Sequence, residues 1–187
     1  MSEKNTISAV INSISYSAVN LIPFIGAYLT LPIYTKFLST DDFGKLLLVT
    51  TLTSLIGIIM TFQLNGAIPR LYFDFDLRGR KILFSTVFYC SIIIGLIMLV
   101  FIIFNNNRLI SLIYDSASND IRNLFNISLV TTFFIQISTV SNRLLIVQEK
   151  SIVVLKRTLI AYPIGVFVGI YSVTILGLGL EGVLYGA

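Results

Sequence analysis

The sequence predicts an all-α membrane protein, a polytopic bundle of transmembrane helices. Hydrophobic residues make up 56% of its 187 residues and charged residues 12%, with a mean hydropathy of +0.91. Soluble domains, in contrast, carry about a quarter charged residues. Long uncharged runs recur along the chain, each with the roughly 20 residues that a helix needs to cross a bilayer. We expect one transmembrane domain, 1–187, with five full spans and the start of a sixth, at about 8–37, 43–68, 82–104, 124–147, 152–176 and 182–187.

The first expected span is longer than a straight crossing requires. Pro23 and Pro32 within it predict a kinked or tilted helix. Asn12, Tyr16 and Asn20 follow one another at intervals of four, so they share one face of the helix. Because a polar face is costly against lipid, it either lines a cavity or hydrogen-bonds a neighbouring helix.

The second expected span begins after a short loop and carries a seam of small and polar residues. Ser39 or Thr40 is placed to cap this helix, and two aspartates follow in its first turn. The seam residues are spaced by three or four: Thr50, Ser54, Gly57, Thr61 and Asn65. We expect this face to pack closely on a neighbour or to line a cavity.

A charged segment, Leu64 to Lys81, lies between two apolar runs and predicts the sidedness of the protein. Its four cations are Arg70, Arg78, Arg80 and Lys81. Short loops rich in Lys and Arg remain cytoplasmic. With the N-terminus inside, nine of the 13 Lys and Arg residues lie on the inner side and four on the outer side. We therefore expect a cytoplasmic N-terminus. Confinement of the cations to loops and span ends argues against a nucleic-acid partner.

The last two full spans add a polar face and a packing notch. One face of the fourth span carries Ser128, Thr132, Gln136, Thr139 and Arg143. Arg143 lies about one turn inside the membrane boundary. In the fifth span, Gly165 and Gly169 have the spacing of a helix-packing motif.

The residue types needed for soluble-type catalysis are scarce. Histidine, the commonest general base and metal ligand, is absent. Cys90 is the single cysteine, so the chain has neither a disulfide framework nor a cysteine-based metal site. We expect no catalytic residue, no metal site and no cofactor, and we do not expect an enzyme.

Three short motifs resemble a known family. They are Leu31-Pro32 before the Leu38–Gly44 loop, the run Asn65–Arg70 at the end of the second span, and the Gly177–Gly182 turn. The chain resembles the oligosaccharide flippases of polysaccharide biosynthesis, which belong to the multidrug/oligosaccharidyl-lipid/polysaccharide exporter superfamily. The resemblance implies that the chain supplies most of the first lobe of such a transporter, and we expect it to be the front part of a longer one.

The resemblance implies two lobes that rock about a hydrophilic cavity. The implied substrate is an undecaprenyl-diphosphate-linked oligosaccharide, the repeat unit of O-antigen, capsule or exopolysaccharide. It would move from the inner to the outer leaflet of the bacterial cytoplasmic membrane. The implied partners are this lipid-linked substrate, membrane lipids, a second lobe, and polymerase or glycosyltransferase machinery.

Two arginines are candidates for binding the lipid diphosphate, because guanidinium groups pair well with phosphate. Arg70 occupies the position at which the second span of the family ends in arginine, and Arg143 lies inside the fourth span. Both also fit a simpler role as anchors at the inner interface. Seven polar residues are candidates for lining the cavity and binding sugar hydroxyls: Asn12, Tyr16, Asn20, Thr61, Asn65, Gln136 and Thr139.

Two other functions compete with the flippase. A multidrug or cation antiporter of the same superfamily typically uses buried carboxylates, but no Asp or Glu lies inside any full expected span. The second competitor is a non-transporting membrane scaffold, in which the polar faces only join helices. The three polar faces favour transport, whereas the expected lack of a second lobe in this chain favours a scaffold.

Overall fold

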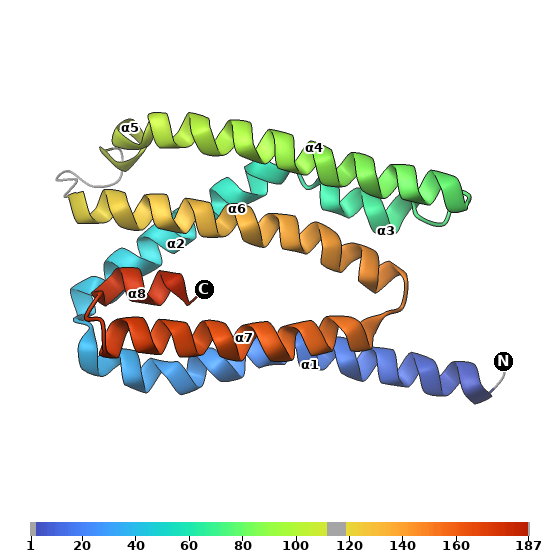
Figure 1. Cartoon of the computed structure of the whole chain (residues 1–187), viewed down its shortest axis with the longest axis horizontal. Helices are drawn as coiled ribbons and strands as arrows, with labels where there is room; N and C mark the ends of the chain where they lie inside the picture. Colours follow the sequence, from blue (N-terminus) through green and yellow to red (C-terminus); the bar gives the residue numbers. More distant parts are fainter. Residues whose placement is uncertain (1–2, 112–118, 187) are drawn as a thin grey trace. The chain divides into compact units, whose positions relative to one another are not determined.

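The computed structural model describes residues 3–111 and 119–186, and it is all-α within those ranges, as the sequence predicts. Five of its helices are long and apolar enough to cross a membrane. These candidate spans are Asn12–Phe37, Thr40–Thr61, Leu77–Phe104, Asp120–Val147 and Ser151–Thr174. The chain divides into two compact units, residues 1–38 with 144–187 and residues 39–143, and Figure 1 shows the helices that make up each one.

In the first unit, α1 (Glu3–Phe37) and α7 (Ser151–Thr174) lie side by side and run in the same direction (Figure 1). The Ser151 hydroxyl donates to Oδ1 of Asn12 at 2.5 Å, and the Tyr162 hydroxyl donates to the Pro23 carbonyl at 2.9 Å. Both bonds join residues that are 139 positions apart. A constant offset means that the two helices are parallel and keep one register between the two bonds.

A short helix, α8 (Gly179–Tyr185), folds back on α7 after a tight turn. Gly177 and Gly179 have φ of 64° and 54°, a left-handed conformation that glycine adopts without steric cost. A Cβ at Gly165 would lie 2.6 Å from the Gly186 carbonyl oxygen, and one at Gly169 would lie 2.6 Å from the Tyr34 hydroxyl. The glycine pair of the fifth span therefore serves close packing.

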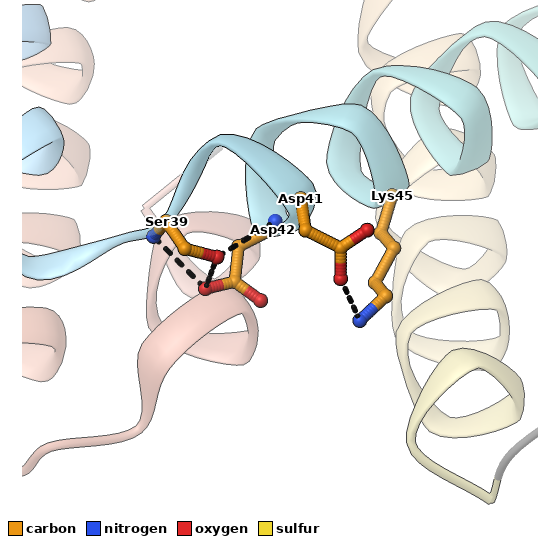
Figure 2. A network of polar contacts seen from close by, with 4 residues as sticks. All are labelled: Ser39, Asp41, Asp42 and Lys45. Carbon is orange, nitrogen blue, oxygen red and sulfur yellow. Dashed lines mark hydrogen bonds and ion pairs between the residues drawn. The ribbon is translucent and has the colours of Figure 1, made fainter.

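The second unit begins with α2 (Thr40–Thr61), whose first turn is held by a capping box (Figure 2). The Ser39 hydroxyl accepts from the Asp42 backbone N–H, and the Asp42 carboxylate accepts from the Ser39 backbone N–H at 3.0 Å. Lys45 and Asp41 form an ion pair of 2.6 Å one turn apart. Of the two expected capping residues, Ser39 is the one that caps α2.

The second span is shorter than the expected 43–68, because α2 ends at Thr61. Phe62 and Gln63 adopt left-handed φ values of 44° and 53°, which stop the helical hydrogen-bond ladder. The chain then continues through a 3₁₀ turn, η1 (Leu64–Gly66), and a five-residue helix, α3 (Ala67–Leu71).

The third span begins earlier than the expected residue 82. Helix α4 (Leu77–Phe104) is capped by Asp76, whose carboxylate accepts from the Gly79 N–H at 2.8 Å. This cap places Arg78, Arg80 and Lys81 on the first turns of α4. A short helix, α5 (Asn106–Ser111), follows α4.

Helix α6 (Asn119–Val147) completes the second unit, except for its last turn. The Thr53 and Ser128 hydroxyls, from α2 and α6, are 2.7 Å apart and hydrogen-bonded in a buried position. A Cβ at Gly95 would lie 2.8 Å from the Phe133 ring, which shows how closely α4 and α6 approach there. The largest fully buried side chains of this unit include Phe125, Met60 and Leu129.

Candidate functional site

Both candidate arginines lie in the second unit and present exposed side chains. Arg70 occupies the last turn of the short helix α3, and Arg143 lies one turn before the end of α6. Within the described ranges, no carboxylate lies within ion-pair distance of either guanidinium. Both cations therefore lack a fixed counter-ion there.

The polar face of α1 is used mainly to join segments of the first unit. Asn12 accepts the hydrogen bond from Ser151, and the Tyr16 hydroxyl donates to the Ile146 carbonyl at 3.2 Å. Asn20 bonds within its own helix, because its amide donates to the Tyr16 carbonyl at 3.0 Å. The structure thus shows the helix-joining role for Asn12 and Tyr16, while their role in lining a cavity remains a prediction.

The polar residues at the end of α2 are buried. Thr61 is 2% exposed, and its hydroxyl donates weakly to the carbonyls of Gly57 and Ile58 at 3.4 and 3.5 Å. Asn65, in η1, is 6% exposed.

The polar residues of α6 approach α2 at Gly57. A Cβ at Gly57 would lie 2.6 Å from the Thr132 methyl carbon and 2.9 Å from the Gln136 amide nitrogen. Thr139 bonds within α6, its hydroxyl donating to the Ile135 carbonyl at 2.9 Å. The structure therefore brings Gln136 to the small-residue face of α2, with Thr61 one turn further along it.

An open hollow of about 360 Å³ lies on another face of α2. Its lining is almost wholly apolar: Leu47, Leu48, Thr51, Leu52 and Leu55. Such a lining suits a lipid chain or an apolar neighbour better than it suits a sugar.

Several polar contacts in the structure were not predicted from the sequence. Thr53 forms the buried link between α2 and α6 with Ser128, which lies on the polar face expected for the fourth span. The sequence had instead indicated Ser54, which is exposed, for the seam of the second span. Tyr162 was not singled out either, and it joins α7 to α1. The spacing of Thr53 and Gly57, four residues apart on one face, was the available signal for the first link.

The described carboxylates are dispersed, and within the described ranges no group of three or more His, Cys, Asp or Glu side chains is placed to hold a metal ion. Asp41 and Asp42 lie in the first turn of α2, and Asp76 caps α4. These three carboxylates stabilise the N-terminal ends of α2 and α4.

A comparison with protein families finds one model that matches most of the chain. The family is described as "Polysaccharide biosynthesis protein", and its model matches residues 33–186, from the last turn of α1 through α8. No curated protein and no solved structure matches the chain.

Proposed function

Because the chain belongs to the family of polysaccharide biosynthesis proteins, we propose that it carries a polyprenyl-diphosphate-linked oligosaccharide across the cytoplasmic membrane, from the inner to the outer leaflet. The family membership confirms the resemblance seen in the sequence motifs. The observation that carries the proposal is the match over residues 33–186, a region built largely of helices that are long and apolar enough to cross a membrane. Transport is the polysaccharide-related task that such a set of helices suits best.

The charged head group is the main energetic obstacle to this transport, because a diphosphate is costly to bring into hydrocarbon. We assign Arg70 and Arg143 to the diphosphate. Both are exposed, and within the described residues neither is neutralised by a carboxylate. Guanidinium groups bind phosphate oxygens through paired, charge-assisted hydrogen bonds.

The sugar would meet amide and hydroxyl groups of the polar faces. In the second unit the candidates are Gln136 and Thr139 on α6, Thr61 at the end of α2 and Asn65 in η1. Asn12 and Tyr16 are engaged between segments of the first unit, so their bonds would have to open before they could contact a sugar. Asn20, next to Tyr16 on this face, is assigned to the sugar together with them.

The proposal includes a cytoplasmic N-terminus, a second lobe against which these helices move, and polymerase or glycosyltransferase machinery as partners. It assigns no catalytic step to the chain. An ion-coupled drug exporter is the less favoured transporter, because the described carboxylates lie at helix ends and in loops.

A membrane scaffold is the second candidate, and one observation favours it. Asn12, Tyr16 and Tyr162 use their polar groups to join segments of one unit, as a scaffold would require. The two functions differ in what accumulates when the gene is deleted. Loss of a flippase leaves the complete lipid-linked unit in the membrane, whereas loss of a scaffold for biosynthetic enzymes leaves truncated units. Mass spectrometry of the extracted lipids distinguishes the two, and truncated units alone would refute the flippase.

A further inference from the structure

The connection between α3 and α4 is shaped by one arginine. The Arg80 guanidinium lies 4.7 Å from the centroid of the Tyr72 ring and 5.9 Å from that of Phe73. Its Nε donates to the Phe75 carbonyl at 2.9 Å. Cation–π contact and this hydrogen bond together hold the connection against the first turn of α4.

The same connection exposes large apolar side chains. Phe73 is 69% exposed, Phe75 43% and Leu77 77%. The connection belongs to the stretch 62–76, which joins the candidate membrane spans α2 and α4, so it lies at a face of the membrane. Exposed Phe and Leu side chains next to Lys and Arg are typical of segments that bury an apolar face at the boundary between head groups and acyl chains.

The segment also carries a net positive charge, because its three cations outnumber its two carboxylates. Arg78 and Lys81 are exposed, and Arg80 is half-buried. Within the described ranges, no carboxylate lies within ion-pair distance of these cations. The nearby Asp76 carboxylate is occupied by the cap of α4. The Asp74 carboxylate makes no hydrogen bond or ion pair among the described residues.

We propose that residues 72–81, the basic aromatic segment, are a binding surface for the head groups of anionic phospholipids. Phe73, Phe75 and Leu77 enter the head-group layer, and Arg78 and Lys81 pair with lipid phosphates. Arg80 acts by shaping the segment. A cation near an anionic leaflet is attracted strongly enough for two of them to decide lipid preference. The inference does not depend on what the protein transports.

Fluorescence tests the insertion, because the chain contains no tryptophan. Phe73→Trp places a single probe in the segment, and Phe104→Trp, at an 84% exposed position at the end of α4, is the matched control. The protein is reconstituted in phosphatidylcholine vesicles with and without an equal part of phosphatidylglycerol. We expect anionic lipid to shift the Phe73→Trp emission to shorter wavelength and to protect it from iodide, with the control unchanged. Equal emission and equal iodide quenching of Phe73→Trp in both vesicles would refute the insertion.

Charge removal tests the head-group contact. The double variant Arg78→Gln with Lys81→Gln is expected to retain phosphatidylglycerol roughly 30-fold less tightly at low salt, measured by native mass spectrometry. The matched pair Lys156→Gln with Arg157→Gln removes two exposed cations from α7. If both pairs lower retention equally, net charge explains the effect and the assigned surface is wrong.

A competition arm identifies the source of the phosphate. Inorganic phosphate at constant ionic strength should leave phosphatidylglycerol retention unchanged, because a lipid head group is also held by the apolar side chains beside the cations. Displacement by inorganic phosphate would instead indicate a site for the free ion and would overturn the proposal.

Discussion

The Tyr162 hydroxyl donates a hydrogen bond to the Pro23 carbonyl at 2.9 Å, and the Tyr162 ring fills the space left by the absent side chain of Gly26. This contact fixes how α7 lies on α1. Together with the bond between Ser151 and Asn12, it makes the two helices parallel. The beginnings of the first and fifth spans are thus at the same end of the pair, as an alternating path through a membrane requires.

Filling the space at Gly26 should loosen this pair. In Gly26→Val the new side chain would overlap the Tyr162 ring, which must then move and give up its bond to Pro23. We expect a loss of about 1–3 kcal/mol in the free energy of unfolding. Gly44→Ala is the control, since a Cβ there has no neighbour within 4 Å and alanine favours the helix by up to about 1 kcal/mol. Denaturant titration in detergent measures the free energy of unfolding of both variants. If Gly26→Val were as stable as the unchanged protein, the contact between Gly26 and Tyr162 would be contradicted.

The buried link between α2 and α6 should show measurable coupling. Thr53 and Ser128 are 2.7 Å apart at their hydroxyl oxygens. A double-mutant cycle with Thr53→Val and Ser128→Ala is expected to give a coupling free energy of about 0.6 kcal/mol, the average for bonds between membrane helices. Strictly additive single and double variants would show that the two hydroxyls do not interact.

The start of α2 should depend on its cap more than on its ion pair. Ser39→Ala removes the hydroxyl that accepts from the Asp42 N–H, and it should cost about 1 kcal/mol. Asp41→Asn breaks the exposed ion pair with Lys45 and should cost only about 0.3–0.5 kcal/mol. The order of the two losses, read from the same denaturant titration, is the test. If Asp41→Asn lost more free energy of unfolding than Ser39→Ala, the ion pair and not the cap would be the stronger contribution, contrary to this prediction.

Hydropathy was sufficient to predict the existence of all five long helices, because each is long and apolar enough to cross a bilayer. It could not place the end of α2. Residues 62–68 remain uncharged, and the two residues that leave the helix, Phe62 and Gln63, are not the glycine or asparagine that usually marks a left-handed turn.

The pairing of helices was harder to predict than their existence. Asn12 and Ser151 are 139 residues apart, and no periodicity within either helix indicates such a distant partner. The polar face of α1 was predicted from its four-residue spacing. Its contacts became visible only in the structure, because a polar face seen in sequence suits a cavity and a neighbouring helix equally well. Arg143 lies near the end of α6, as expected, whereas Arg70 was expected at the end of the second span and lies in the separate helix α3.

Transport should depend both on the positive charge of Arg143 and on the paired hydrogen-bond geometry of its guanidinium group. In the full gene product, Arg143→Ala is expected to lower the export of surface polysaccharide about 10- to 150-fold, because one charge-assisted contact to the diphosphate is lost. Arg143→Lys should retain part of the activity, since an ammonium keeps the charge without the paired geometry. Arg157→Ala removes an exposed cation from α7 and serves as the matched control. Undiminished export in Arg143→Ala would leave the residue as an interface anchor.

The proposed transport is tested most directly by measuring in which leaflet the lipid-linked oligosaccharide resides. In spheroplasts, a membrane-impermeant lectin labels only units exposed on the outer face, and total units are measured after detergent lysis. Deleting the gene should abolish outer-face labelling while the complete unit accumulates in the lysate, and restoring the gene should restore the labelling. Outer-face labelling that persists without the gene, at an unchanged total, would contradict the proposed transport.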